Sequence, residues 1–275
     1  MEILTYRAFT TTDKESGNPA GVVLDAEALD RADMLRIAAD LGFSETAFLT
    51  EITPTSARIR YFTPLDEIAF CGHATIASGV ALASRGAGPV VTLATKAGEV
   101  PVEVTPDAAT LIAVDSSVAP LAEHLLDELL AALRLAHGDL DPAMPAAFVR
   151  GGNPHPVIFV ADGVLARLDH DAEAVLALQN REGWDGTVPV VHRVSATRFV
   201  SRNPFPRGGI REDPATGSAA ASLGYYLRDG GRVTLPAVIE VEQGAQTGHP
   251  SRLVVEIPVE GRVRVTGRAA QISAA

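Results

Sequence analysis

Residues 73–84 read HATIASGVALAS, and residues 216–227 read TGSAAASLGYYL. Neither stretch contains Asp, Glu, Lys or Arg. A helix without a polar face is buried on all sides, and small side chains let a sheet wrap closely around it. The two stretches therefore predict an α+β fold in which each half is a mixed, curved, barrel-like sheet around one central apolar helix.

An internal repeat places these two stretches at equivalent points of the chain. GNPAGVVL at 17–24 resembles GNPHPVIF at 152–159, RYFT at 60–63 resembles RFVS at 198–201, and CGHAT at 71–75 resembles PATGS at 214–218. Similar segments in the same order indicate a duplicated chain. We expect a first half over residues 1–118, completed by a C-terminal strand at about 262–275, and a second half over 119–261. The active site is expected in the cleft between them.

Hydrophobic patterns predict the other elements. Residues 28–42 form an amphipathic helical pattern that ends at Gly42, and residues 120–137 show helical spacing of Leu and Ala that is broken at Gly138. Short apolar or alternating runs predict strands at 90–95, 99–104, 156–161, 187–191, 237–243, 252–259 and 262–272.

Composition limits the class of protein. The 275 residues carry a net charge of −11 without a run of Lys or Arg, which argues against binding to nucleic acid through its phosphates. No stretch approaches the roughly 18 apolar residues of a membrane helix, and the N-terminus lacks the apolar core of a signal peptide. The single cysteine cannot form an internal disulfide. We expect a cytoplasmic protein that acts on a small molecule, with no membrane or nucleic-acid partner.

The starts of the two apolar helices are candidate anion sites. The first N–H groups of a helix have no intrahelical partner, and this end carries partial positive charge. The predicted starts include Gly72 and Ala74 in the first half and Gly217 and Ser218 in the second. Two such starts facing one cleft would bind a substrate carboxylate or a developing oxyanion.

Cys71 and His73 lie two residues apart at the first of these starts. A metal site is disfavoured and none is expected, because zinc usually takes three or four protein ligands and the sequence offers no second cysteine. Cys71 is either a nucleophile with His73 as its base or a small buried packing residue. His73 is placed to orient a substrate, and its alternative role is purely structural.

Glu45 stands between the predicted helix that ends at Gly42 and the apolar run at 47–49. Desolvation at the mouth of a core strand raises the pKa of a carboxyl group toward neutrality, which suits a general base. The alternative is a glutamate that caps a helix or turn, and the residues alone leave both open.

Asp213 stands before Pro214 and the second apolar helix. Asp followed by Pro is the pattern of an N-cap, and Asp213 could also bind substrate. Ser218 lies in the first turn, where its hydroxyl could reach the cleft. We expect Arg211 and Glu212 to form ordinary surface pairs.

The two GNP motifs are typical of turns that lead into strands, with Pro at the start of an edge strand. Asn18 lies in the first motif, and His155 directly follows the second. Both are additional candidates for residues that line the cleft.

Five blocks of the sequence together resemble the phenazine-biosynthesis isomerase (PhzF-like) family. They read GNPAGVVL, SETAFL, YFTPLDEIAFCGHATIASG, GGNPHPV and REDPATGSAA. The resemblance implies the diaminopimelate epimerase-like fold, with two similar halves and the site between them. It also implies a homodimer and a reaction without a cofactor, such as the isomerisation of trans-2,3-dihydro-3-hydroxyanthranilate.

The same resemblance implies roles for four residues. Glu45 matches the acid/base carboxylate of the family, which removes a proton from one carbon and returns it at another carbon of the same ring. His73 and Asp213 match positions that orient polar groups of a small cyclic carboxylic acid. Ser218, with the two helix starts, is expected to hold the carboxylate.

Diaminopimelate epimerases and proline racemases share this fold and use two cysteines. Cys71-Gly72-His73 resembles the first half of their motif, but the repeat aligns the second cysteine position with Pro214, which cannot act as a base. A two-thiol mechanism is therefore excluded. Two alternatives stay open: an amino-acid or hydroxy-acid epimerase that uses Cys71 with a carboxylate, and a non-catalytic small-molecule-binding protein on the same scaffold.

Overall fold

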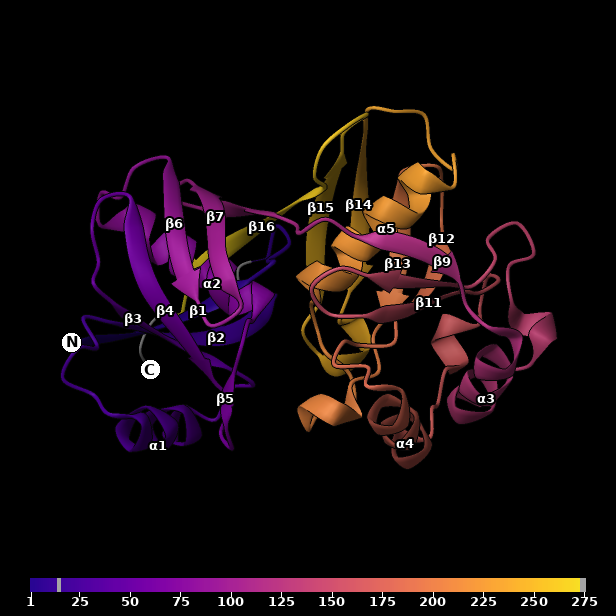
Figure 1. The fold of residues 1–275 in the computed structure, drawn as a ribbon, viewed down its shortest axis with the longest axis horizontal. Helices are drawn as coiled ribbons and strands as arrows, with labels where there is room; N and C mark the ends of the chain where they lie inside the picture. Colours follow the sequence, from indigo (N-terminus) through magenta and orange to yellow (C-terminus); the bar gives the residue numbers. More distant parts are fainter. Residues whose placement is uncertain (14–15, 273–275) are drawn as a thin grey trace. The chain divides into compact units, whose positions relative to one another are not determined.

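The computed structural model describes residues 1–13 and 16–272 and divides the chain into two units (Figure 1). The first unit comprises Met1–Ile112 together with the segment that begins at Thr266, and the second comprises Ala113–Val265. Each unit contains a mixed sheet packed against one central apolar helix. The α+β fold of two similar halves, predicted from the two charge-free stretches, is confirmed.

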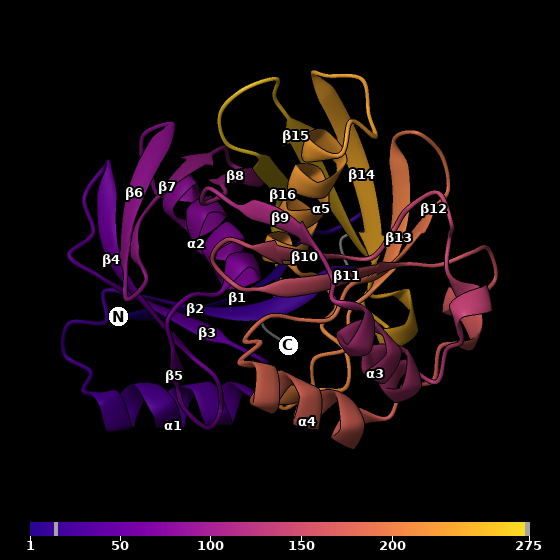
Figure 2. The same ribbon diagram turned by 45° about the vertical axis from the view of Figure 1, so that its right-hand side comes forward.

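The first unit is a closed barrel. Its strands in spatial order are β1 (Glu2–Ala8), β2 (Asn18–Leu24), β3 (Thr46–Thr50), β4 (Ser56–Phe62), β6 (Val90–Thr95), β7 (Gly98–Val104), β8 (Ala108–Ile112) and β16 (Arg264–Gln271). Pairing of β1 with β16 closes the ring, and β5 (Glu67–Ile68) pairs with β4. Helix α2 (Gly72–Ser84) contacts β1, β2, β3, β7 and β8 from inside the ring (Figure 2). Its residues from His73 to Leu82 are all buried, as a helix without a polar face requires.

Helix α1 (Arg31–Leu41) packs against β3 and β4 through an apolar stripe. The side chain of Asp30 caps its start by accepting a hydrogen bond from the backbone N–H of Asp33. Gly42 ends the helix in the left-handed region, at φ 67°, as the sequence predicted. This turn returns the chain to the start of β3.

In the second unit the sheet is open in its strand order. The order is β15 (Ser251–Ile257), β14 (Ala237–Gln243), β13 (Arg198–Arg202), β12 (Val190–Arg193), β11 (His155–Phe159), β10 (Ala147–Arg150) and β9 (Ser117–Pro120). Helix α5 (Gly217–Asp229) packs against β9, β10, β11 and β15. Helices α3 (Glu123–Leu133) and α4 (Ala172–Glu182) lie side by side and share a hydrophobic cluster that includes Leu129, Leu133, Val175 and Trp184 (Figure 2).

The two units repeat one plan of strand pairing. In the first unit β2–β3 and β4–β6 are parallel, while β1–β2, β3–β4 and β6–β7 are antiparallel. In the second unit β11–β12 and β13–β14 are parallel, while β10–β11, β12–β13 and β14–β15 are antiparallel. The central helix connects β4 to β6 in one unit and β13 to β14 in the other. The halves therefore share a topology as well as sequence motifs.

Helix bounds correct the sequence alignment of the two halves. Helix α2 begins at Gly72 and α5 at Gly217, which are 145 residues apart, whereas matching CGHAT with PATGS gives 143. Cys71 therefore corresponds to Thr216 and not to Pro214. Threonine is not a base near neutral pH, so the two-thiol mechanism remains excluded after this correction.

Close packing between helix and sheet supports this register. A Cβ atom added at Gly79 of α2 would lie 3.0 Å from Val104 Cγ1, and one added at Gly224 of α5 would lie 2.9 Å from Val263 Cγ1. Both glycines let the helix approach the sheet, and they too are 145 residues apart. This packing requirement is stronger evidence for the alignment of α2 with α5 than the short match of CGHAT with PATGS.

The strand registers shift a second match. Val23 pairs with Phe48 and Phe48 with Arg60. The equivalent chain of pairs in the second unit runs from Ile158 through Val190 to Arg202. Arg60 therefore corresponds to Arg202, and the match of RYFT with RFVS is wrong by four residues.

Most predicted elements agree with the observed ones. The strands predicted at 90–95 and 237–243 coincide with β6 and β14, and the other predicted strands overlap β7, β11, β12, β15 and β16. The helix expected within 120–137 ends at Leu133, because Arg134 adopts φ 54° before Gly138 is reached. The edge-strand interpretation of the GNP motifs is wrong, since β2 and β11 each pair on both sides.

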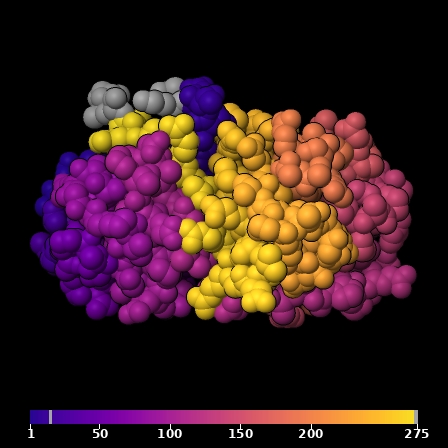
Figure 3. Space-filling model, turned by 90° about the horizontal axis from the view of Figure 1, so that it is seen from above, coloured from indigo at the N-terminus to yellow at the C-terminus, as the bar shows by residue number. Residues whose placement is uncertain are grey.

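Within the described residues, no helix has the length and apolar character needed to cross a membrane. Part of the segment that contains β15 and β16 reaches the face shown in Figure 3, where it is drawn in yellow. The turn that joins β15 to β16 belongs to this segment and carries the exposed Val259.

Candidate active site

Glu45 lies where α1 returns the chain to the barrel. Gly42 reverses the chain after α1, and β3 begins at Thr46 and runs parallel to β2. The backbone carbonyl of Glu45 accepts a hydrogen bond from the N–H of Gly21 (3.2 Å). Backbone pairing therefore fixes Glu45 at the entrance of β3, and its side chain is only 13% exposed.

The start of α2 is fixed by a second set of hydrogen bonds. The carbonyl of Cys71 accepts hydrogen bonds from the backbone N–H of Thr75 (3.1 Å) and from its hydroxyl (2.6 Å). The hydroxyl of Tyr61 on β4 in turn donates to Thr75 Oγ1 (2.6 Å). Cys71 occupies the N-cap position without capping through its side chain, and His73 is the second residue of the helix.

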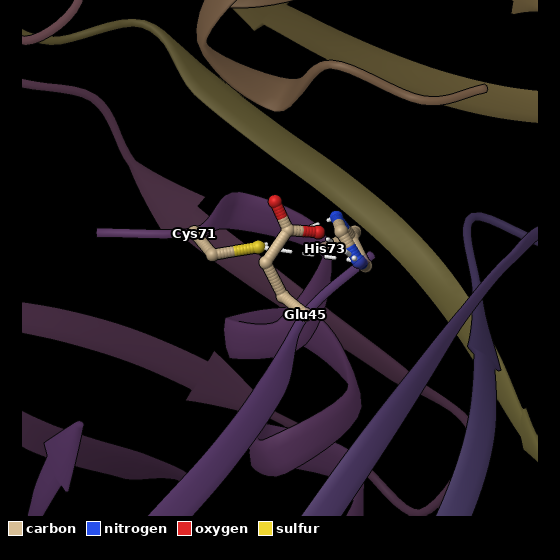
Figure 4. Close-up of side chains that lie close together, drawn as sticks. All are labelled: Glu45, Cys71 and His73. Carbon is tan, nitrogen blue, oxygen red and sulfur yellow. Dashed lines mark hydrogen bonds and ion pairs between the residues drawn. The ribbon is translucent and has the colours of Figure 1, made fainter. Parts of the chain in front are cut away.

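Three side chains converge at this point (Figure 4). Glu45 Oε2 lies 3.3 Å from His73 Nε2, and Cys71 Sγ lies 3.3 Å from His73 Nδ1. The imidazole thus stands between a carboxyl group and a thiol, and it is itself buried (4% exposed). The prediction that Glu45 and His73 share one site agrees with this geometry, although their catalytic roles stay predictions.

Burial raises the pKa of the Glu45 carboxyl group above its ordinary value. The neighbouring side chains of Ser44 and Cys71 oppose this effect without cancelling it. A carboxyl group in this state can accept a proton and hold it, which is the property a general acid/base needs.

The same three side chains could also hold a metal ion. One ligand atom from each of Glu45, Cys71 and His73 can be chosen so that all lie within 4.8 Å of one another. Imidazole, thiolate and carboxylate are all ligands that zinc accepts. The sequence alone suggested only the Cys71–His73 pair, because nothing in the spacing of residues points to Glu45 as a third ligand.

Asp213 precedes α5 but does not cap it. The helix begins at Gly217 with Thr216 at the N-cap position, so the N-cap interpretation of Asp213 is wrong. The Asp213 carboxylate instead accepts a hydrogen bond from Thr216 Oγ1 (2.6 Å). Pro214 and Ala215 separate Asp213 from the N-cap residue Thr216. The hydrogen bond between Asp213 and Thr216 therefore organises the loop that precedes the helix.

Gln243, at the end of β14, is a residue that sequence reasoning missed. Its side-chain amide donates to the carbonyl of Asp213 (2.6 Å) and to Thr216 Oγ1 (3.1 Å). Its carbonyl oxygen accepts from the N–H of Thr216 (3.2 Å). Gln243 is buried and clamps the loop that carries Asp213. Its position at the end of a strand offered no signal in the sequence.

Ser218 is the second residue of α5, the position that His73 occupies in α2. Its Oγ lies 2.9 Å from Nε2 of His155. His155 Nδ1 lies 2.9 Å from the backbone carbonyl of Thr187. The structure thus joins two of the predicted residues, Ser218 and His155, which are 63 residues apart in the chain.

The remaining predicted residues lie as follows. Gly72 and Ala74 are in the first turn of α2, Gly217 opens α5, and Asn18 is buried at the start of β2. Arg211 forms the expected surface contact, with Asp169. Glu212 does not, because it is buried and pairs with the buried Arg202.

Comparison with known proteins identifies the family. A family profile described as "Phenazine biosynthesis-like protein" (PhzC-PhzF) matches residues 6–275. An uncharacterized isomerase of Deinococcus radiodurans is 36% identical over 266 residues, covering 92% of this chain and 86% of that protein. The trans-2,3-dihydro-3-hydroxyanthranilate isomerase of Pseudomonas chlororaphis is 30% identical over 275 residues, covering 97% of this chain and 91% of that protein.

Solved structures show the same fold. A phenazine biosynthesis protein of the PhzF family from Bacillus anthracis superposes with a TM-score of 0.86 at 26% identity, over 99% of this chain and 98% of that one. A probable proline racemase from Agrobacterium radiobacter K84 shares the fold at 16% identity, with a TM-score of 0.63, over 99% of this chain and 92% of that one. The chain therefore belongs to the PhzC-PhzF family of phenazine biosynthesis-like proteins and is an isomerase.

Proposed function

We propose that this isomerase moves a proton between two carbons of a small cyclic carboxylic acid, with Glu45 as the only acid/base and without a cofactor. The observation that carries the proposal is the buried carboxyl group of Glu45, whose pKa is raised and which lies 3.3 Å from His73 Nε2. The relative from P. chlororaphis, named for trans-2,3-dihydro-3-hydroxyanthranilate, supports this class of substrate.

The reaction needs no redox partner. Charged Glu45 takes a proton from a carbon of the substrate, so a C–H bond breaks, an O–H bond forms, and the electron pair moves into the adjacent unsaturated system. Neutral Glu45 then returns the proton to another carbon, where a new C–H bond forms. Burial favours the neutral carboxyl between the two steps. His73 Nε2, 3.3 Å from Glu45 Oε2, is proposed to stabilise the charged form before and after them by donating its N–H to the carboxylate when substrate is bound.

Backbone N–H groups at the helix starts are proposed to bind the substrate carboxylate. Gly72, His73 and Ala74 provide them in α2, and Gly217 does so in α5. Partial positive charge at a helix start favours an anion. Asp213 is proposed to orient a polar group of the substrate.

The test is deuterium incorporation from solvent into trans-2,3-dihydro-3-hydroxyanthranilate during turnover. We expect wild type to incorporate deuterium and Glu45→Gln to show neither incorporation nor product. Glu99→Gln is the matched control, since Glu99 is an exposed glutamate on β7 of the same unit. Normal incorporation by Glu45→Gln that unfolds like wild type would remove Glu45 from this role.

The contact between Cys71 Sγ and His73 Nδ1 favours one second candidate, an epimerase of an amino or hydroxy acid in which His73 deprotonates the thiol. Cys71→Ala distinguishes the two. Loss of turnover in Cys71→Ala with retained turnover in Glu45→Gln would favour the epimerase, and the opposite pattern favours the isomerase.

A cytoplasmic homodimer completes the proposal. It rests on the family resemblance and on the prevalence of two-fold dimers among oligomers. Light scattering of the purified full-length chain measures its mass directly, and a monomer at micromolar concentration would contradict the proposed dimer.

A further inference from the structure

The imidazole of His155 is enclosed between two polar groups of the second unit. The side chain extends from β11 and is fully buried (0% exposed). Its Nδ1 lies 2.9 Å from the backbone carbonyl of Thr187, and its Nε2 lies 2.9 Å from Ser218 Oγ. Nδ1 also lies 3.3 Å from Thr187 Oγ1, so Thr187 is the partner residue of Nδ1 and Ser218 that of Nε2.

The partners determine which nitrogen carries the proton. A backbone carbonyl oxygen only accepts hydrogen bonds, so Nδ1 must be protonated to make the contact with Thr187. Burial lowers the pKa of His155 to about 4, so the ring is neutral at neutral pH and carries a single proton. Nε2 is then unprotonated, and the hydroxyl group of Ser218 must donate its hydrogen to it.

This assignment limits what Ser218 can offer a ligand. A serine hydroxyl has one hydrogen and two lone pairs. With the hydrogen directed at His155, only the lone pairs face away from the imidazole. A carboxylate is itself an acceptor and cannot use them, whereas an N–H or O–H group can. Ser218 as a residue is partly exposed.

The pocket around the ring is built to hold this orientation. A Cβ atom at Gly186 would lie 2.7 Å from Cε1 and 2.8 Å from Nδ1 of His155, so glycine is needed beside the ring. The carbonyl of Gly186 accepts a hydrogen bond from the side chain of Gln179 (2.8 Å), which holds this segment in place. The ring is therefore enclosed by two segments of the unit, Gly186–Thr187 and the start of α5, and Gln179 holds the first of them in place.

We propose that His155 is a positioning residue that fixes the Ser218 hydroxyl as a hydrogen-bond acceptor, so that Ser218 binds an amino or hydroxyl group of the substrate and not its carboxylate. The specificity half of this proposal rests on the proposed function. The sequence led us to expect that Ser218 holds the substrate carboxylate, and this proposal changes that role. The preferred substrates then carry a carboxylate and, in addition, an amino or hydroxyl group that can donate a hydrogen bond.

The first experiment needs no substrate. Long-range ¹H–¹⁵N correlation spectra of the full chain labelled with ¹⁵N-histidine report the tautomer of each ring, and the His155 signals are assigned from their loss in His155→Gln. We expect a protonated Nδ1 and an unprotonated Nε2, with the Nε2 signal shifted in Ser218→Ala. A protonated Nε2 in the wild-type protein would overturn the proposal.

The second experiment tests specificity. Dissociation constants are measured by calorimetry for 3-hydroxyanthranilate, a stable aromatic analogue, and for benzoate, which keeps the carboxylate and lacks both donors. Loss of one hydrogen bond predicts about 10-fold weaker binding of the hydroxyanthranilate to Ser218→Ala and His155→Gln. The double variant is expected to bind no more weakly than Ser218→Ala alone, because His155 acts through Ser218.

Benzoate binding is expected to change by less than about 2-fold in the same variants, since no donor is lost. Equal losses for both ligands would show that Ser218 holds the carboxylate and would overturn the specificity half. His192→Gln is the control, because His192 also contacts a backbone carbonyl in this unit, that of Val160. If the wild type bound both ligands but did not isomerise dihydro-hydroxyanthranilate, the proposed reaction would fail while the assignment of Ser218 stood.

Discussion

The second residue of each central helix carries a polar side chain, and the two units surround it differently. In the first unit it is His73, which contacts Glu45 and Cys71. In the second it is Ser218, which contacts His155. The first set holds a carboxyl group whose pKa is raised by burial, whereas burial keeps His155 neutral. One scaffold thus holds a buried carboxyl group of raised pKa in one copy and an enclosed, neutral imidazole in the other.

Strand registers extend this comparison to the neighbouring positions. Phe48 and Val190 are equivalent, so Glu45 corresponds to Thr187; Glu45 directly precedes β3, and Thr187 lies three residues before β12. The GNP motifs align Ala20 with His155. Both units therefore place an imidazole near the helix start, but on the helix in one case and on a strand in the other. The acidic partner is present only in the first.

The largest expected effect concerns Glu45 and Thr187, the equivalent positions of the two units. Glu45→Gln should lower kcat by about 10²–10⁴-fold, the usual contribution of a general acid/base, with little change in KM. Thr187→Val retains the carbonyl that holds His155, so its effect should stay below about 10-fold and appear in KM. Steady-state kinetics with dihydro-hydroxyanthranilate measures both. A loss in kcat of equal size in Thr187→Val would break the distinction between the units.

The next effect is an opposite dependence of stability on pH. The pKa of His155 falls from 6.5 to about 4 on folding, so the unfolded chain binds more protons in this range. The stability contributed by neutral His155 is present above pH 6.5 and is lost as the pH falls toward 4, by about 3 kcal/mol. Glu45 has the opposite sign: its raised pKa means that the folded chain holds the extra proton, so stability falls as the pH rises above the ordinary value of 4.5.

Urea unfolding between pH 4 and 8 separates the two contributions. In His155→Gln, the loss of stability as the pH falls toward 4 should become smaller. In Glu45→Gln, the loss of stability as the pH rises above 4.5 should become smaller. Glu99→Gln serves as the control. Identical profiles for all three variants would show that neither buried group titrates as described.

A smaller effect tests what the units share. Alanine at Gly79 would place its Cβ 3.0 Å from Val104 Cγ1, and alanine at Gly224 would place it 2.9 Å from Val263 Cγ1. Better helix propensity, about 1 kcal/mol, is outweighed by overpacking of about 1–3 kcal/mol. We expect both variants to lose up to about 2 kcal/mol in urea unfolding.

Gly138→Ala is the control for these variants, because nothing lies within 4 Å of a Cβ at that position. It should change the free energy of unfolding by less than about 0.5 kcal/mol. Stabilisation by alanine at either helix glycine would contradict the close approach of helix and sheet.

The smallest effect concerns the outer helices, whose caps are also duplicated. Asp30 caps α1 and Asp171 caps α4, each by accepting a backbone hydrogen bond three residues later. Replacing either with alanine should cost about 1 kcal/mol in thermal or urea unfolding. Asp40→Ala, which removes only an exposed pair with Arg36, should cost less than about 0.5 kcal/mol. A clear difference between the two cap variants would show that the outer helices contribute unequally.

Local patterns were sufficient for much of this architecture. The charge-free stretches led to α2 and α5, Gly42 to the end of α1, and the GNP motifs to the duplication. These features depend on side chains within one element or turn, where burial and backbone preference act over a few residues. The motif blocks also led to the family, because they combine residue types at fixed short spacings.

The site depended on contacts that no local pattern encodes. Glu45 meets His73 because β3 pairs with β2 in one register and α2 begins at Gly72, and Gln243 reaches Asp213 across 30 residues. Two further features also depend on contacts between distant segments: the burial of Glu212, and the equivalence of Cys71 with Thr216 in place of Pro214.

The sequence by itself determined the two buried helices, the repeat and the residue types available for chemistry. Only the tertiary structure decided which of them touch, that His155 Nε2 lies against the hydroxyl of Ser218, and that Cys71 stands beside an imidazole that also contacts Glu45. The physical reason is that strand register and the close approach of helix to sheet are set by packing over the whole unit, whereas propensity and periodicity act only along a few neighbouring residues.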